Sequence, residues 1–102
     1  MINGINSREM ILEILLEIEE GEHSHVAIRN ALSKYQFLPK QDRAFITRVC
    51  EGTLEYRIQI DYIINSFSKV TVDKMKPAIR EILRSAVYQL KYMDSVPDSA
   101  VC

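Results

Sequence analysis

The chain has 102 residues, close to one average domain, so it is too short for a kinase, a two-domain dehydrogenase or a methyltransferase domain. Hydrophobic residues make up 47% and charged residues 26%, the balance of an ordinary globular domain, and three glycines and three prolines are too few for a fold with many tight turns. The net charge is -1 and the pI about 6.1, so composition alone indicates no strong attraction to nucleic acid or to a membrane surface.

Cysteine and histidine are too sparse for a disulfide framework or a metal site. Cys50 and Cys102 are far apart, and His23 and His25 do not complete the about four closely spaced ligands that zinc needs. We expect Cys50 to be a small buried hydrophobic residue. No apolar run approaches the ~18 residues of a membrane span, and the amino end lacks the layout of a signal peptide. We therefore expect a cytoplasmic protein with no metal and no membrane partner.

The first predicted helix covers residues 6–20. Asn6 can accept from the first-turn N–H groups and Glu9 can reach back, which together form a capping box. Gly21 is placed to end the helix in a left-handed conformation. One apolar stripe at steps of three and four is expected to face the core: Met10, Ile11, Ile14, Leu15 and Ile18.

A second helix is predicted over residues 25–35, with Ser24 as its cap. Pro39 disfavours helix at the residue before it, so the helical pattern is interrupted over residues 37–39.

The helical pattern then resumes over residues 40–67. This length is about twice that of an average helix, so we expect a kink or break between Glu55 and Gln59. Gly52 has no side chain, so another helix could cross closely there; the alternative is a tolerated glycine that costs ~1 kcal/mol against alanine. The apolar series at steps of three and four that predicts the buried face is Phe45, Val49, Gly52 or Thr53, Tyr56, Ile60, Ile63 and Phe67.

The last complete helix is predicted to begin at Pro77, after a polar connection over residues 68–75, and to end at Asp94. Residues 97–100 have the composition of a further helix start. No long period-two alternation occurs, so the fold class is all-α, a bundle of about five helices. The apolar stripe of the last helix falls within about 100° of arc and is expected to face the core: Ile79, Ile82, Leu83, Ala86, Leu90 and Met93.

A basic face runs along the same helix. Lys76, Arg80, Arg84 and Lys91 lie within ~80° of one another on a helical wheel, with Tyr88 near the edge of the apolar stripe. Cations beside an aromatic ring suit phosphate contact and base stacking, so these five residues are candidate RNA contacts. The alternative is a solvated face on which Arg84 packs its stem over the core.

The other charged residues singled out in the sequence give no indication of a catalytic site. Asp61 interrupts an apolar stretch and is expected to face solvent or the amino end of another helix. General acid–base chemistry needs a second positioned group, and none is identifiable, so we predict no catalytic residue. Arg43 is expected to have a structural role, by pairing with Asp42 or capping a neighbouring helix.

Three short sequence motifs, taken together in their order and spacing, identify a protein family more specifically than any single residue does. They are Asp42-Arg43-Ala44-Phe45, then Gly52-Thr53-Leu54 with Ile60-Asp61-Tyr62-Ile63, then residues 82–90 followed by Val96-Pro97. Over about residues 7–102 this set resembles the NusB-like domain, an all-helical RNA-binding module. The resemblance implies mainly architectural roles for the motif positions Asp42, Arg43, Gly52, Asp61, Tyr88, Gln89 and Pro97.

The family has two branches, and the resemblance implies a different parent for each. One is the antitermination factor NusB itself; the other is the amino-terminal domain of the RsmB (Sun) enzymes, which methylate C5 of a cytosine in small-subunit (16S) ribosomal RNA. The runs GTLEYRIQIDYII and YQLKYMDSVPDSAV favour the RsmB branch. The Arg-rich start of the first helix that contacts RNA in NusB is reduced here to Arg8, beside Glu9 and Glu13. The later basic helix is therefore the better RNA candidate.

The resemblance also implies further helices, and in an RsmB-like parent a later catalytic domain that binds S-adenosylmethionine. We therefore expect a piece of a longer protein that is not itself an enzyme, with no catalytic role for Cys50 or Cys102. The apolar stripe of residues 79–93 would then lack part of its partner, which predicts a homodimer.

Three functions remain open. The chain is an RNA-binding domain that holds ribosomal RNA or orients a catalytic domain, a stand-alone antitermination factor that acts on RNA with a ribosomal-protein partner, or a helical domain that contacts only protein.

Overall fold

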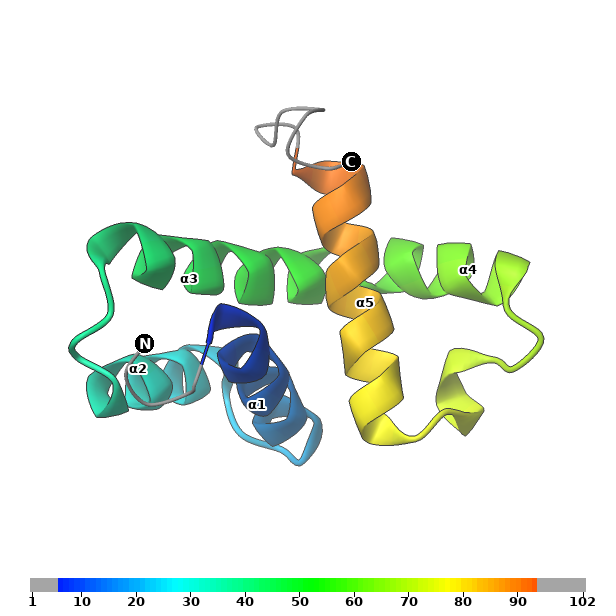
Figure 1. Cartoon of the computed structure of the whole chain (residues 1–102). Helices are drawn as coiled ribbons and strands as arrows, with labels where there is room; N and C mark the ends of the chain where they lie inside the picture. Colours follow the sequence, from blue (N-terminus) through cyan, green and yellow to red (C-terminus); the bar gives the residue numbers. More distant parts are fainter. Residues whose placement is uncertain (1–5, 94–102) are drawn as a thin grey trace.

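The protein is all helical over residues 6–93, the part of the chain that the structure describes (Figure 1). In the computed structural model these residues contain no strand, and the predicted all-α bundle of about five helices is confirmed. The elements are α1 (Ser7–Glu19), α2 (Ser24–Lys34), α3 (Lys40–Glu55), α4 (Arg57–Phe67), the short 3-10 helix η1 (Val72–Lys74) and α5 (Pro77–Tyr92).

Two helices form the centre of the arrangement. α1 packs against α2, α3 and α5, while α5 packs against α1, α3 and α4. Figure 1 shows α4 continuing roughly along the line of α3, with α5 crossing both near their junction. The core is therefore assembled from contacts between segments that are distant in sequence. Its most completely buried large side chains are Met10, Ile14, Leu15, Ile46, Val49, Ile60 and Ile64.

Both predicted signals at the ends of α1 are present. The Asn6 side chain accepts from the Glu9 N–H at 2.9 Å, and the Glu9 carboxylate accepts from the Asn6 N–H at 3.3 Å, which completes the capping box. Gly21 has φ of +114°, a conformation that favours glycine, directly after the helix ends. Local chemistry alone therefore sets the bounds of α1.

The start of α2 differs from the prediction. Ser24 is the first residue of the helix, and the capping position belongs to His23, which makes no side-chain cap hydrogen bond. The prediction that Ser24 caps this helix was wrong. The predicted interruption is confirmed, because α2 ends at Lys34 and Pro39 occupies the capping position of α3.

The break in the long central pattern lies at Tyr56, within the predicted interval. Tyr56 has φ of −102° and ψ of 21°, outside the helical range, and separates α3 from α4. The Tyr56 N–H still donates to the Gly52 carbonyl at 3.0 Å, and the Ile60 N–H donates to the Tyr56 carbonyl at 2.8 Å. Beyond the break Ile64 is buried and Phe67 is exposed, so the prediction that Phe67 faces the core was wrong.

The side of α5 that packs against the core is not the side that its apolar stripe predicts. Ile79, Ile82 and Leu90 are 50%, 51% and 74% exposed, whereas Met93 is buried, so part of the stripe has no partner among the described residues, in agreement with the expectation that its partner is incomplete. At about 100° per residue the stripe lies almost opposite the side that is actually buried. That inward side carries Glu81, Arg84 and Tyr88.

Part of this orientation comes from the crossing of α5 over α3 at Gly52. Tyr88 lies so close to Gly52 that a Cβ atom there would overlap the tyrosine ring. The predicted close approach at Gly52 is therefore confirmed. Tyr88 also stacks with Tyr56 and Tyr92. The ring centroids of Tyr56 and Tyr92 are 4.4 Å apart, and the two rings are within 9° of parallel.

The close crossing predicts the effect of one methyl group. Gly52→Ala should lower the free energy of unfolding by about 1–3 kcal/mol, since the Tyr88 ring must move to admit the Cβ atom. Urea denaturation followed by circular dichroism measures the change. At an open helical site the same substitution stabilises by up to ~1 kcal/mol, so a more stable variant would contradict the crossing.

Candidate nucleic-acid interface

Arg84 is the most heavily bonded side chain among the described residues of α5. Its Nε and Nη2 atoms donate to the two carboxylate oxygens of Asp61, each at 2.8 Å, in a bidentate pair. Its Nη1 atom donates to Glu81 at 2.9 Å and to Glu19 at 3.0 Å. The guanidinium therefore joins α1, α4 and α5 at one point, and its side chain is 8% exposed.

Arg80, one turn earlier on α5, extends this ion-pair cluster. Its Nη1 donates to Glu19 at 2.9 Å and its Nη2 donates to the Met75 carbonyl at 2.9 Å. Glu19 thus accepts from both arginines, one at each carboxylate oxygen. We call Glu19, Asp61, Arg80, Glu81 and Arg84 the ion-pair cluster.

The carboxyl groups of the cluster differ in their pKa values. Burial, aided by the hydrogen bond with Glu19, raises the pKa of Glu81 from 4.5 to about 7. For Glu19, partial burial raises the pKa, but the hydrogen bond with Glu81 and the charges of Arg80 and Arg84 outweigh it and lower the pKa overall. The pair resembles two carboxyl groups that share one proton near neutral pH.

These contacts change the interpretation of the basic face. A phosphate could reach the Arg84 guanidinium only by displacing three carboxylates, and Arg80 is held between Glu19 and a backbone carbonyl. Tyr88 is buried against Gly52, so its face is not open to a base. The prediction that Arg80, Arg84 and Tyr88 contact RNA does not fit their placement.

The two lysines of the predicted face are exposed. Lys76 precedes α5 and Lys91 lies in its last turn. They are therefore the members of the predicted set that a phosphate backbone can reach, and their role stays a prediction.

The exterior of the segment from α4 to α5 is mainly positive. Asp61 and Glu81 are drawn into the ion-pair cluster, which leaves Asp73 as the exposed carboxylate of residues 57–93. The exposed cations of the same segment are Arg57, Lys69, Lys74, Lys76 and Lys91.

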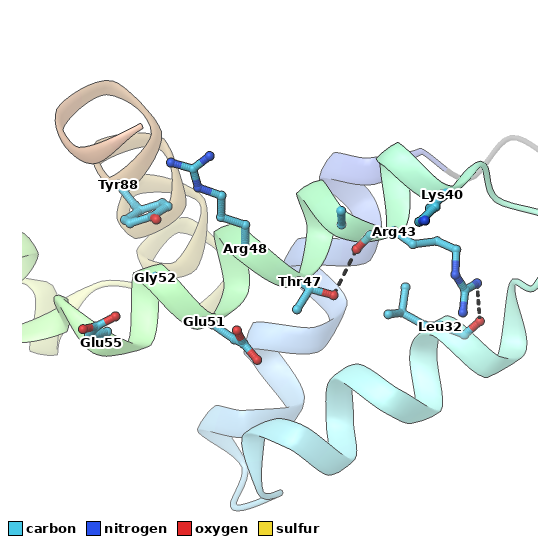
Figure 2. A pocket seen from close by; sticks show the side chains of 10 residues that line it. Leu32, Lys40, Arg43, Thr47, Arg48, Glu51, Gly52, Glu55 and Tyr88 are labelled. Carbon is cyan, nitrogen blue, oxygen red and sulfur yellow. Dashed lines mark hydrogen bonds between the residues drawn. The ribbon is translucent and has the colours of Figure 1, made fainter. Parts of the chain in front are cut away.

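A separate groove of about 550 Å³ runs along α3 between α2 and α5 (Figure 2). Arg43 bridges α2 and α3 there, because its Nη1 donates to the carbonyls of Leu32 at 3.0 Å and Tyr35 at 3.4 Å. Arg43 thus caps the end of α2, one of the two roles considered for it. The groove is lined by charges of both signs: Lys40, Arg43, Arg48, Glu51 and Glu55.

The remaining residues singled out in the sequence have local roles or lie elsewhere. Asp61 was expected to face solvent or the amino end of another helix. It does neither and instead pairs with Arg84. Cys50 is buried, as predicted, and burial beside Glu51 raises the pKa of its thiol to about 12. Gln89 donates to the Ser85 carbonyl at 3.3 Å, and Asp42 lies in the first turn of α3.

Pro97, Cys102 and the predicted helix start at residues 97–100 lie outside the described residues. Within residues 6–93, no group of three His, Cys, Asp or Glu side chains is placed to hold a metal ion. No helix in that range is long and apolar enough to cross a membrane.

Sequence reasoning missed Glu19 and Glu81 as members of the cluster. A signal was present for Glu81, which lies three residues before Arg84 and therefore on the same side of α5. Glu19 is 65 residues from Arg84, and no local pattern connects them.

The fold and the cluster define an all-helical domain in which ion pairs join α1, α4 and α5. The sequence model of the NusB family matches residues 5–102, and the chain belongs to the NusB family. No solved structure matches it.

Curated relatives come from both branches of the family. The chain is 30% identical over 93 residues to the "Probable ribosomal RNA small subunit methyltransferase B" of Bacillus subtilis (strain 168), covering 91% of this chain and 21% of that protein. It is 33% identical to the protein of the same name from Synechocystis sp., covering 94% of this chain and 22% of the relative. It is also 30% identical to the "Transcription antitermination protein NusB" of Desulforamulus reducens, covering 91% of this chain and 66% of the relative. The chain thus spans about a fifth of the methyltransferase relatives and about two thirds of the NusB relative.

Removing the central cation tests the ion-pair cluster. Arg84→Met should lower the free energy of unfolding by about 3 kcal/mol at pH 7, because it leaves partly buried carboxylates without their counter-ion. Urea denaturation measures the loss. Lys91→Met, at an exposed position of the same helix, is the matched control and should change stability by less than ~0.5 kcal/mol. Equal effects of the two substitutions would contradict the cluster.

The raised pKa of Glu81 predicts a pH dependence. Between pH 4.5 and about 7 the folded state retains a proton on Glu81 that the unfolded state has lost, so through this group the free energy of unfolding falls as the pH rises. Glu81→Gln keeps the shape but cannot ionise, and it should flatten the stability profile over that range. Glu55→Gln, at an exposed site, should leave the profile unchanged. A slope that survives Glu81→Gln would show that the proton is held elsewhere.

Proposed function

We propose that this chain is an RNA-binding domain of the NusB family that acts in the cytoplasm. The observation that carries the proposal is the family match over residues 5–102, with relatives named for ribosomal RNA methylation or for transcription antitermination. The exposed cations of the segment from α4 to α5 support it, because such a surface attracts a phosphate backbone. Binding would be mainly electrostatic, and Lys76 and Lys91 are its proposed contacts.

We further propose that the parent is an RsmB-type ribosomal RNA cytosine-C5 methyltransferase. The runs around Gly52 and Tyr88 favour that branch, and two relatives of that name match more than 90% of the chain. In such a parent, S-adenosylmethionine and the reactive cysteines would belong to a catalytic domain outside this chain, which would hold RNA or orient that domain. A stand-alone antitermination factor with a ribosomal-protein partner is the second candidate, supported by the NusB relatives.

The length of the complete reading frame separates the two parents. A frame of ~130–150 residues would identify a NusB-type factor, and one of more than ~400 residues the methyltransferase. Either outcome leaves the proposal of RNA binding to be tested separately.

RNA binding is tested by a filter-binding titration over a range of salt concentrations, with small-subunit ribosomal RNA fragments as the probe. Replacing Lys76 and Lys91 together by Gln should weaken binding and reduce the slope of log affinity against log salt by about 0.7 for each lysine that contacts single-stranded RNA. Lys34→Gln, an exposed lysine on α2, is the matched control and should leave the slope unchanged.

Two results would contradict this account. An unchanged slope in the double variant would remove the proposed surface. No binding at low salt would favour the third function, a helical domain that contacts only protein.

A further inference from the structure

Tyr62 differs from the other tyrosines of the chain in its surroundings. Tyr35 packs edge-on against another ring, and Tyr56, Tyr88 and Tyr92 stack on one another. Tyr62 makes no ring contact with any described residue, and it is 77% exposed on α4. Its flat face is therefore available to a ligand, whereas the other four rings are engaged inside the fold.

The Tyr62 side of α4 does not have the pattern of a surface that packs into a core. Tyr62 lies about 160° around the helix from Ile60 and from Ile64, the buried residues of α4. A core-facing stripe repeats apolar residues at steps of three and four. From Tyr62 these steps reach one apolar residue and three polar ones: Ile58, Gln59, Asn65 and Ser66. The further helices that the family resemblance implies were expected against residues 79–93 of α5, so they do not account for this ring.

The connection after α4 is tied to the end of that helix. The Asn65 side-chain oxygen accepts from the Val72 N–H at 2.9 Å, and the Ser68 hydroxyl donates to the Val70 carbonyl at 2.8 Å. Asn65 lies three residues after Tyr62, about 60° from it around the helix. These bonds therefore hold residues 68–72 close to the Tyr62 side of α4.

Most of the exposed charges along this segment are positive. Arg57 is the first residue of α4, and Lys69 and Lys74 lie in the connection and the 3-10 helix that follow it. Within residues 57–74 the exposed charged side chains are these three cations and the carboxylate of Asp73. The surroundings of the Tyr62 ring thus carry a net positive charge.

A planar group on an anionic chain fits both features. Proteins that bind single-stranded RNA stack its bases on exposed aromatic rings and hold its phosphates with nearby cations. A basic protein segment would be repelled by the same cations. An acidic peptide would also suit the cations, and it is therefore the competing occupant in the test.

We propose that Tyr62 stacks on an unpaired base of single-stranded RNA, while Arg57, Lys69 and Lys74 contact the neighbouring phosphates. This inference rests on the proposed RNA-binding function and deepens it, because it specifies a single-stranded ligand and the residue that holds a base. The ring supplies a part of the affinity that does not depend on salt, and the cations supply the part that does.

A fluorescent reporter tests the stacking directly. The chain contains no tryptophan, so Tyr62→Trp introduces a single indole and keeps an aromatic ring at this position. Single-stranded fragments of small-subunit ribosomal RNA should quench the fluorescence of that indole, because a stacked base covers it, and a fully paired RNA duplex should not. Phe37→Trp is the matched control, at a 60% exposed position in the turn between α2 and α3. It should bind the same RNA without quenching.

Filter binding over a range of salt concentrations tests the contribution of the ring to affinity. Tyr62→Ser should weaken RNA binding about fivefold or more and leave the slope of log affinity against log salt unchanged, since it removes a stacking surface but no charge. Tyr62→Phe keeps the ring and should retain the affinity of the unaltered chain. Because Tyr62 is exposed, circular dichroism should show that all variants remain folded.

The outcomes separate this inference from the function on which it rests. If the unaltered chain binds RNA and Tyr62→Ser binds equally well, or if both tryptophan variants are quenched alike, or if the duplex quenches as strongly as the single strand, the stacking is overturned while RNA binding stands. Tyr62 would then be left to an acidic peptide or another protein partner. If the unaltered chain binds no RNA at low salt, both proposals fail.

Discussion

The Arg84 guanidinium is the point at which three helices are held together. Its donors reach Asp61 on α4, Glu19 at the end of α1 and Glu81 on its own helix, and every nitrogen of the fork is used. A buried cation is tolerated only with such complete pairing, because its desolvation costs several kcal/mol. The rest of the arrangement depends on this geometry, since it sets the rotation of α5 about its own axis.

The rotation of α5 determines which chemistry the surface displays. The inward side takes up Glu81 and Arg84 together with Tyr88, whose ring occupies the space left by Gly52. Carboxylates of α4 and α5 are thereby withdrawn from the exterior, and lysines and aliphatic side chains remain outside. The proposed RNA-binding surface therefore depends on the same packing that sets the orientation of α5.

Much of the fold could be predicted because its signals are local. The capping box at Asn6, the left-handed Gly21 and the break near Tyr56 each depend on residues within one helical turn. The close crossing at Gly52 was also predictable, since only glycine leaves such space inside a helix. The resemblance to the NusB-like domain also predicted the all-α fold, and the family match over residues 5–102 agrees with that prediction.

The orientation of α5 could not be predicted in this way. Hydrophobic periodicity assigns the apolar side of a helix to the core, and here the charged side is buried instead. The partners that reverse the assignment, Asp61 and Glu19, are 23 and 65 residues from Arg84. No local pattern reports such pairs, so the ion pairs that occupy Arg80 and Arg84 could not be predicted from the sequence of α5 alone.

A double-mutant cycle between Arg84 and Asp61 tests the central claim most directly. Urea denaturation of Arg84→Gln, Asp61→Asn and the double variant gives the coupling free energy of the pair. A bidentate, largely buried pair should give a coupling of at least about 1.5 kcal/mol, with the double variant less destabilised than the two single effects combined. A coupling near zero would contradict the account and would return Arg84 to the solvated face of α5.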